Sequence, residues 1–306
     1  MKKRDFITLL DLEPEQLSML LDRSREVKRA GMGMTDRPLM GKSVGILFEK
    51  ASTRTRVSFE VGIYQLGGQS IFLSPRDVHL SRGEPLSDTA KVLSRYLSAL
   101  VVRTFSHESV EILARESDIP VINALTDLTH PCQALADLQT IKENRDTLKG
   151  TRVTYLGDGN NVANSLIIGC SMTGIELTLA CPEGYDPDPR FLAEGIKRAD
   201  QAGGSVELVR DPVQACRGAH FLYTDVWTSM GQEEESEKRQ KDLAAYQLNI
   251  DRLNDAAPDA RILHCLPAHR GEEITEELID HPRSAIFDQA ENRLHTQKAL
   301  LEWLVK

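Results

Sequence analysis

One stretch, Ile46 to Glu60, most constrains how this chain can fold, because its fifteen residues join a buried strand, a polar turn and a helix start. The apolar run from Val44 to Phe48 predicts a strand that is buried on both faces. Apolar residues spaced i, i+4, i+7 from Val57 to Tyr64 predict a helix that follows at once. A strand that runs straight into a helix through a polar turn is typical of an α/β sheet.

The polar turn between them, Ser52-Thr53-Arg54-Thr55, lies at the predicted N-terminus of that helix. The first backbone N–H groups of a helix lack partners within it and the helix dipole is positive there, so the position favours an anion. Arginine adds a planar fork that matches phosphate oxygens. A plain N-cap followed by a solvated basic turn is the alternative. Five polar residues between apolar blocks favour a phosphate site.

Composition limits what the rest of the chain can do. With 306 residues, 41% of them hydrophobic, the chain can bury a large core, and its length predicts two domains. The net charge of −9 and the absence of a basic run longer than Lys2-Lys3-Arg4 argue against a nucleic-acid partner. No stretch approaches the ~18 apolar residues of a membrane span and no signal sequence is visible, so we expect a cytoplasmic protein without a membrane partner.

The cysteines are odd in number and scattered, and no pair has C-x-x-C spacing. They are Cys132, Cys170, Cys181, Cys216 and Cys265. This distribution favours reduced thiols over a disulfide framework. His264, Cys265 and His269 could suggest zinc, but the sequence offers no fourth ligand nearby. We therefore expect neither a metal nor a cofactor.

Two further strands of the first half end in candidate ligands. The strand Ala99 to Val102 delivers Arg103 at its C-terminal end, where open α/β sheets bind their ligands. The strand Val121 to Asn123 leads to His130 and Gln133 at the mouth of another helix. His130 alone could equally be a structural cap. Together these residues predict one pocket shared with the polar turn.

The second half begins again with a strand at Val153, after a charged break from Asn144 to Gly150. Gly157-Asp158-Gly159 resembles a dinucleotide fingerprint, but Val162 stands at the third glycine position. A nicotinamide dehydrogenase therefore has little support. Further strands are predicted at Glu176–Ala180, Val206–Val209, His220–Thr224 and Arg261–His264. The expected fold class is α/β, with two open parallel-sheet domains and helices on both faces of each sheet.

Four motifs together resemble the aspartate/ornithine carbamoyltransferase family, on its ornithine-specific branch. They are FEKASTRTR at 48–56, HPCQALAD at 130–137, Asp225-x-x-x-Ser229-Met230-Gly231 and HCLP at 264–267. The match spans the whole chain. The resemblance implies a carbamoyl-phosphate domain at 1–148, an ornithine domain at 149–289 and a C-terminal helix, 290–306, that returns to the first domain. It also implies a homotrimer with sites near the subunit interfaces.

The resemblance implies an activity as well: transfer of the carbamoyl group from carbamoyl phosphate to the δ-amine of L-ornithine, giving L-citrulline and phosphate in arginine metabolism. N-acylornithine, putrescine and aspartate are alternative acceptors, because a few side chains decide such choices. A non-catalytic carbamoyl-phosphate-binding relative is the remaining alternative. The direction of the reaction in the cell and any assembly beyond a trimer stay open.

Site residues follow from the same resemblance, position by position. Arg103, His130, Cys265 and Asp225 are implied to be catalytic. Those implied to bind carbamoyl phosphate are Ser52, Thr53, Arg54, Thr55, His79, Arg103, His130, Gln133, Cys265, Leu266 and Arg293. Those implied to bind ornithine are Asn161, Asp225, Ser229 and Met230. His79 stands where many members carry a glutamine that reaches a neighbouring subunit's phosphate.

The chemistry explains this division. An amine with a pKa near lysine's ~10.4 is neutral in only about one molecule in a thousand at pH 7, so a carboxylate such as Asp225 suits the cationic substrate. The oxyanion that forms when the amine attacks the carbonyl carbon needs fixed donors such as Arg103 and His130. The charged segment that follows, up to about Lys241, has little apolar surface, so we expect a lid that orders over the bound amino acid.

Overall fold

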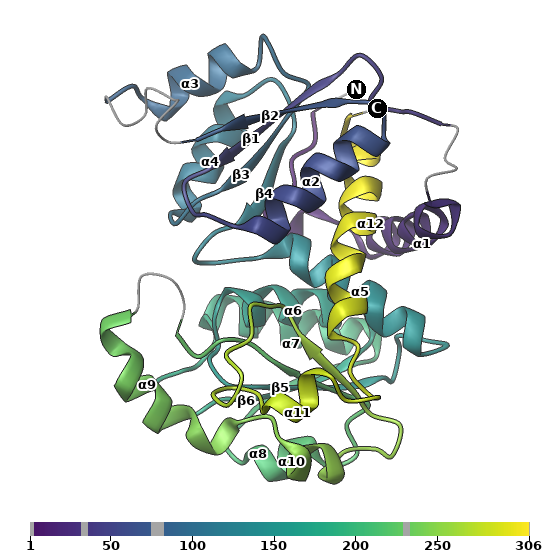
Figure 1. The fold of residues 1–306 in the computed structure, drawn as a ribbon, viewed down its shortest axis with the longest axis vertical. Helices are drawn as coiled ribbons and strands as arrows, with labels where there is room; N and C mark the ends of the chain where they lie inside the picture. Colours follow the sequence, from purple (N-terminus) through teal and green to yellow (C-terminus); the bar gives the residue numbers. More distant parts are fainter. Residues whose placement is uncertain (1–2, 32–35, 75–82, 229–232, 306) are drawn as a thin grey trace. The chain divides into compact units, whose positions relative to one another are not determined.

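The computed structural model describes residues 3–31, 36–74, 83–228 and 233–305. It divides into two compact units, Met1–Gln139 with Asn292–Lys306, and Thr140–Glu291 (Figure 1). We refer to them as unit 1 and unit 2. Each contains a parallel sheet with helices packed on it, which confirms the predicted fold class.

The sheet of unit 1 has the strand order β2-β1-β3-β4, and every pair in it is parallel. The strands are β1 (Ser43–Phe48), β2 (Gln69–Leu73), β3 (Ala99–Arg103) and β4 (Val121–Leu125). The helices of this part are η1 (Leu9–Asp11), α1 (Pro14–Ala30), α2 (Thr53–Gln65), α3 (Leu86–Leu93) and α4 (His107–Glu116). The connection after β1 leads to β2 on one side of it, whereas β3 lies on its other side, so β1 and β3 form a topological switch point. A ligand is expected beside the carboxyl ends of the two strands at such a point.

Strand register brings the predicted ligands of unit 1 to one edge of its sheet. Phe48 at the end of β1 is the register partner of Arg103 at the end of β3, and Arg103 lies opposite Leu125 at the end of β4. The polar turn at residues 52–55 and the segment leading to His130 therefore leave the sheet at neighbouring points. The local strand–turn–helix pattern was sufficient to predict this convergence.

Two helices cross the division between the units. Helix α5 (Pro131–Asn144) belongs to unit 1 up to Gln139, and α12 (Ile286–Val305) belongs to unit 1 from Asn292 onward. The predicted domain boundary, between residues 148 and 149, lies just after the end of α5.

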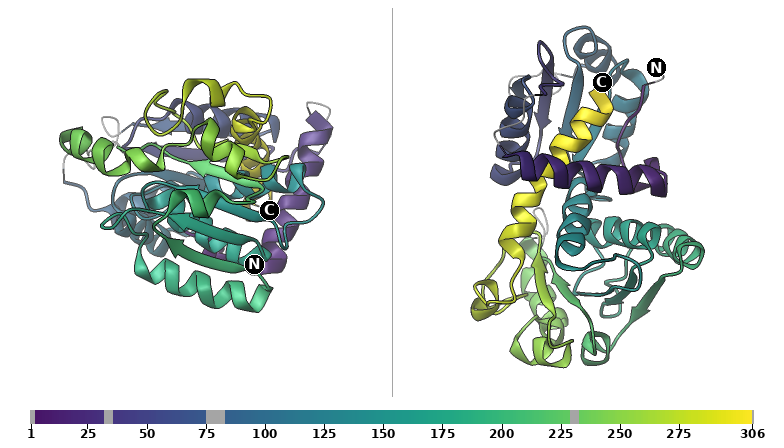
Figure 2. Two further views of the ribbon diagram at one scale, coloured as in Figure 1. Left: turned by 90° about the horizontal axis from the view of Figure 1, so that it is seen from below. Right: turned by 90° about the vertical axis from the view of Figure 1, so that its right-hand side faces the viewer.

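The C-terminal helix returns to unit 1, as predicted. The right-hand view of Figure 2 shows α1 crossing α12. At this crossing Arg23 Nε donates to Glu302 Oε2 at 2.9 Å and Lys28 Nζ donates to Asn292 Oδ1 at 2.8 Å. These bonds attach the last helix of the chain to the first.

Helix α2 presents two different faces. Phe59 and Ile63 are fully buried, whereas the spaced residues that predicted the helix, Val57, Val61 and Tyr64, are 49%, 36% and 77% exposed. The period was right for a helix, but the buried face is set by the residues between. A stripe of exposed apolar side chains therefore runs along α2.

The sheet of unit 2 has the strand order β7-β6-β5-β8-β9, again entirely parallel. Its strands are β5 (Arg152–Leu156), β6 (Glu176–Ala180), β7 (Ser205–Val209), β8 (Phe221–Thr224) and β9 (Arg261–His264). Its helices include α6 (Asn161–Thr173), α7 (Pro189–Ala202), α8 (Pro212–Cys216), η4 (Glu233–Glu235), α9 (Ser236–Leu243), η5 (Ala244–Tyr246), α10 (Ile250–Asp255) and α11 (Glu276–Ile279). Here chain order reverses between β5 and β8.

The glycines that resemble a dinucleotide fingerprint have a packing role. A Cβ on Gly159 would lie 2.1 Å from the backbone nitrogen of Pro187 and 2.4 Å from the carbonyl carbon of Asp186. Gly157 has φ +126°, which side-chain-bearing residues rarely adopt. Another segment of backbone thus occupies the space beside Gly159, which explains this glycine without a pyrophosphate.

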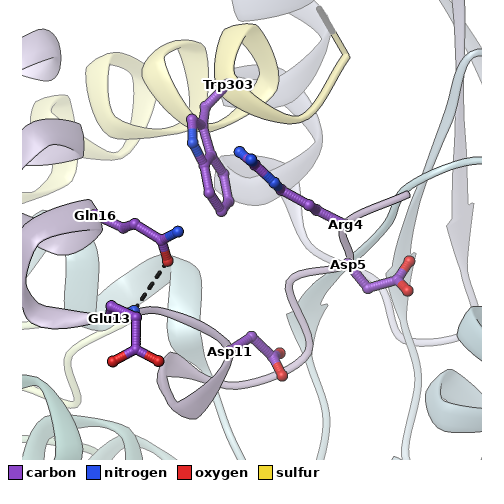
Figure 3. A pocket seen from close by; sticks show the side chains of 6 residues that line it. All are labelled: Arg4, Asp5, Asp11, Glu13, Gln16 and Trp303. Atoms are coloured by element: carbon purple, nitrogen blue, oxygen red, sulfur yellow. Dashed lines mark hydrogen bonds between the residues drawn. The ribbon is translucent and has the colours of Figure 1, made fainter. Parts of the chain in front are cut away.

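A separate pocket of about 400 Å³ lies in unit 1 (Figure 3). Its lining residues are Arg4, Asp5, Asp11, Glu13, Gln16 and Trp303. The Arg4 guanidinium lies 5.0 Å from the centre of the Trp303 ring. Among the described residues, none of those predicted to form the site lines this pocket.

Among the described residues, every helix is too short or too polar to span a bilayer.

Candidate active site

The turn that opens α2 forms the cap that its sequence predicts. Ser52 is the N-cap residue, and its hydroxyl accepts a hydrogen bond from Thr55 N at 3.3 Å. Thr55 is buried, whereas Thr53 and Arg54 are exposed. The capping and anion-binding interpretations are compatible here, because the cap bond uses Thr55 N while the neighbouring Arg54 is exposed.

Arg293 connects two of the predicted phosphate ligands from the returning helix. Its Nη1 donates to Gln133 Oε1 at 2.7 Å and its Nη2 lies 3.4 Å from Thr55 Oγ1, with all three residues buried. Gln133 Nε2 in turn donates to Asp137 Oδ1 at 2.8 Å. Arg293 is therefore buried against side chains from α2 and α5 that are predicted to bind the same phosphate.

His130 is buried among cations. Burial lowers the pKa of its imidazole well below the ordinary 6.5, and the charges of Arg293, Arg103 and Lys50 lower this pKa further. The ring is therefore neutral at pH 7, and a neutral imidazole still has one N–H to donate to a carbonyl oxygen. Such a site keeps three positive charges near one uncharged donor.

Lys50 belongs to this group although it was not among the predicted site residues. Its side chain is 7% exposed, and its ammonium lies 3.3 Å from Asp127 Oδ1 and 4.4 Å from the centre of the Phe105 ring. Its place inside the FEKASTRTR motif, two residues after the end of β1, could have indicated it. Unit 1 thus gathers Lys50, Arg103 and Arg293 at one edge of its sheet, a charge set that suits an anionic ligand.

In unit 2 the predicted catalytic pair is in direct contact. The Cys265 thiol donates to Asp225 Oδ1 at 2.7 Å, and Asn160 Nδ2 donates to Asp225 Oδ2 at 2.7 Å. The register explains the meeting, because Leu156, Thr224 and His264 at the ends of β5, β8 and β9 lie side by side. A buried carboxylate with a thiol beside it suits a cationic ligand.

The HCLP motif is held in an uncommon backbone conformation. Leu266 has φ +57°, a left-handed backbone conformation that costs a non-glycine residue about 1–3 kcal/mol. Its N–H donates to His264 Nδ1 at 2.8 Å, and His264 Nε2 lies 3.1 Å from Glu273 Oε1. Since Nδ1 accepts, the proton of a neutral His264 ring lies on Nε2 and is donated to Glu273. Glu273, which sequence reasoning missed, thereby orients the loop that carries Cys265.

One predicted site residue lacks the contact that was expected of it, and three others lie outside the described residues. Asn161 is the first residue of α6, but it is the preceding residue, Asn160, that contacts Asp225 and caps the helix. His79, Ser229 and Met230 lie outside the described residues. Their roles stay predictions.

The charged run predicted as a weakly anchored lid is partly anchored. Residues 236–243 form α9, in which Arg239 and Leu243 are buried, and Leu243 packs with Tyr185 and Trp227. The expectation that this run lacks anchoring contacts is therefore wrong for α9, because one arginine and one leucine in an otherwise polar sequence point inward.

Two groups of three side chains in the described chain lie close enough to share a metal ion. They are Asp225 with His264 and Cys265, and His269 with Glu272 and Glu273. In the first group both ring nitrogens of His264 are already engaged, by Leu266 N and by Glu273. A metal there would have to displace one of these bonds.

Fold and sites together define a two-domain α/β protein with a cationic site at one parallel sheet and an acidic site at the other. Models of one protein family match both halves of the chain. The aspartate/ornithine carbamoyltransferase carbamoyl-P binding domain matches residues 4–143, and the Asp/Orn binding domain of the same family matches residues 149–304.

Relatives and solved structures give the same assignment. The chain is 53% identical over 301 residues to the ornithine carbamoyltransferase of Gloeobacter violaceus, covering 98% of this chain and 95% of that one. It is 53% identical over 300 residues to that of Bacillus subtilis, covering 98% and 93%. The structure of ornithine carbamoyltransferase from Pyrococcus furiosus matches with a TM-score of 0.95 at 49% identity, covering 98% of this chain and 96% of that one. This chain belongs to the aspartate/ornithine carbamoyltransferase family.

Proposed function

We propose that this protein transfers the carbamoyl group of carbamoyl phosphate to the δ-amine of L-ornithine, giving L-citrulline and phosphate. The observation that carries this is the contact of Asp225 with Cys265 and Asn160 in unit 2, because it provides an acidic site for an amine. The relatives named above, about half of whose residues are identical, are all ornithine carbamoyltransferases. The product would enter arginine metabolism.

Carbamoyl phosphate is assigned to the carboxyl edge of the unit 1 sheet. The phosphate would lie at the start of α2, where the Ser52–Thr55 turn, Arg54 and Arg293 supply N–H, hydroxyl and guanidinium donors. Arg103 and the neutral His130 would donate to the carbonyl oxygen, which becomes an oxyanion when the amine attacks. The positive charges around His130 also offset the charge of the departing phosphate.

Ornithine is assigned to the carboxyl edge of the unit 2 sheet. Asp225 would attract the protonated δ-amine, and the amine must lose one proton before its lone pair can attack the carbamoyl carbon. As the C–N bond forms and the C–O bond to phosphate breaks, a second amine proton leaves. Asp225, hydrogen-bonded to the Cys265 thiol, would accept one of the two protons, and the departing phosphate would accept the other.

The acceptor alternatives differ in charge. Aspartate carries a second carboxylate, which would meet Asp225 and the neighbouring Asp158 instead of a cation. N-acylornithine and putrescine both keep the reacting amine of ornithine. N-acylornithine lacks its α-ammonium group, and putrescine lacks its α-carboxylate. The acidic site excludes aspartate most strongly.

An acceptor panel tests this proposal. Initial rates of carbamoylated product are measured with L-ornithine, N-acetylornithine, putrescine and L-aspartate at equal carbamoyl phosphate. We expect citrulline from ornithine at a kcat/KM at least about 100-fold above each other acceptor, the range that a few polar contacts provide. A preference for any other acceptor, or no product with all four, would disprove the proposed function.

We also propose the domain division 1–148 with 290–306, and 149–289, and a homotrimer with sites near its subunit interfaces. The exposed apolar stripe of Val57, Val61 and Tyr64 on α2 supports an interface, because large apolar side chains aligned on one face of a helix commonly mark one. Light scattering should give about three times the 34.2 kDa chain mass.

The free cysteines, Cys132, Cys170, Cys181, Cys216 and Cys265, support a reducing cytoplasmic location.

A further inference from the structure

One arginine inside the charged run of α9 is buried while its neighbours are not. The Arg239 side chain is 7% exposed, whereas that of Lys238 is 73% exposed. Removing a guanidinium from water is unfavourable unless hydrogen bonds and an opposite charge compensate it. Its position therefore points to specific partners.

Those partners come from two other loops of unit 2. Arg239 Nε donates to the backbone oxygen of Trp227 at 2.5 Å, and Nη2 donates to Asp158 Oδ2. The guanidinium also lies 5.0 Å from the centre of the Tyr185 ring. One side chain thus joins the loop after β5, the loop after β8 and α9.

Both loops carry groups of the acidic site. Asp158 is two residues before Asn160, whose Nδ2 holds Asp225 Oδ2, and Trp227 is two residues after Asp225. The Asp158 loop is fixed further by Tyr155, whose hydroxyl donates to Asp158 O at 2.9 Å. Arg239 consequently holds two segments that position Asp225, the loop that carries Asn160 and the residues directly after Asp225.

We propose that Arg239 is a positioning residue for the amine-binding site: by bridging Asp158 and the Trp227 backbone it fixes where Asp225 points. This inference rests on the proposed function, since it assigns ornithine to the Asp225 site. It predicts a loss mainly for the amino-acid substrate, because most of the described residues assigned to carbamoyl phosphate, Ser52–Thr55, Arg103, His130, Gln133 and Arg293, belong to unit 1, and only Cys265 and Leu266 belong to unit 2.

Charge also matters in this bridge. The charges of Arg239, Asp225 and Glu235 act on the carboxyl of Asp158, and burial raises its pKa to about 6. Without Arg239 this carboxyl would face Asp225 with no cation from α9. It would then take up a proton or turn away, and either response shifts the loop that carries Asn160.

The test compares Arg239→Met and Arg239→Lys with Lys238→Met, which removes an exposed charge from the next position of the same helix. We expect Arg239→Met to raise the KM for ornithine at least about tenfold, since a misplacement near 1 Å can cost as much as 100-fold. The dissociation constant for carbamoyl phosphate, measured by calorimetry, should change less than about twofold. Arg239→Lys should recover part of the loss because it keeps the charge, and Lys238→Met should behave as wild type.

An unchanged KM for ornithine in folded Arg239→Met, or equal losses for both substrates, would overturn the proposal. Where Arg239→Met does not fold, Asp158→Asn tests the same bridge from its other end and should raise the same KM in the same way. Failure of the proposed function is distinguishable, because it would appear in the wild-type protein as an absence of citrulline.

Discussion

The two sheets use the same geometry for opposite charges. In each, chain order reverses between two central strands, β1 and β3 in one and β5 and β8 in the other, and the candidate ligands follow the carboxyl ends of those strands. Yet the first edge collects Lys50, Arg103 and Arg293, while the second collects Asp158 and Asp225. The fold therefore fixes where a ligand binds, and the few side chains after the strands decide which ligand.

The two edges also differ in how their side chains are held. In unit 1 the ligands lie at helix starts, on α2 and α5, and are tied by Arg293 from α12. In unit 2 they lie on loops after strands, and depend on bracing residues such as Glu273 and Arg239. We therefore expect substitutions in unit 1 to act on binding directly, and those in unit 2 to act partly through loop position.

The largest effect should come from the acceptor carboxylate. Asp225→Asn removes the charge that attracts the amine and accepts its proton, so kcat/KM for ornithine should fall about 10²- to 10⁴-fold, the usual contribution of a positioned acid–base group. Steady-state citrulline assays measure this. Asp251→Asn, an exposed carboxylate of the same unit, is the control and should leave kcat/KM unchanged. A loss below about threefold in Asp225→Asn would remove Asp225 from the mechanism.

A second large effect, on carbamoyl phosphate affinity, should come from the cationic edge of unit 1. Arg293→Met removes a buried guanidinium that bonds Gln133 and approaches Thr55, so carbamoyl phosphate affinity should fall on the order of 100-fold, as when one partner of a buried charged hydrogen bond is removed. Calorimetric titration gives the affinity. The matched control is Arg95→Met, an exposed arginine of unit 1. Normal affinity in a folded Arg293→Met protein would contradict a phosphate role.

The buried carboxyl of Asp158, at the acidic edge, should make the free energy of unfolding depend on pH. The pKa of Asp158 is raised to about 6 from 3.8, so the folded state binds more protons than the unfolded state between these pH values. The resulting stabilisation is complete below about pH 4 and is lost as pH rises through 6, a change of about 3 kcal/mol. Urea unfolding should show this loss in wild type but not in Asp158→Asn. Parallel pH profiles for the two proteins would rule out the raised pKa.

The smallest effect concerns His79, which lies outside the described residues. If its imidazole replaces the family's glutamine at a neighbouring subunit's phosphate, it should bind more strongly when protonated, near its unperturbed pKa of ~6.5. The KM for carbamoyl phosphate should then rise about threefold between pH 6 and pH 7.5 in wild type and stay flat in His79→Gln. Identical pH profiles would leave His79 without this role.

Sequence patterns predicted the unit 1 site better than the unit 2 site, for a physical reason. A strand, a cap and a helix start are local, so Ser52, Arg103 and His130 could be placed at one edge from period and spacing alone. Glu273 and Arg239 act through partners distant in the sequence, and a single buried arginine in a charged run has the same local pattern as a solvated one. The same limit explains α2, whose apolar period predicted the helix but not its buried face.

The most direct test of the division between a cationic and an acidic edge is calorimetry on Arg293→Met and Asp225→Asn with two ligands. Carbamoyl phosphate is titrated first, and L-norvaline, which resembles ornithine without its reacting amine, is titrated into protein saturated with inorganic phosphate. We expect Arg293→Met to lose carbamoyl phosphate affinity about 100-fold and Asp225→Asn to keep carbamoyl phosphate affinity within about twofold. Norvaline binding should survive in Asp225→Asn, because the amine that Asp225 attracts is missing. Equal loss of carbamoyl phosphate affinity in both variants would contradict the division.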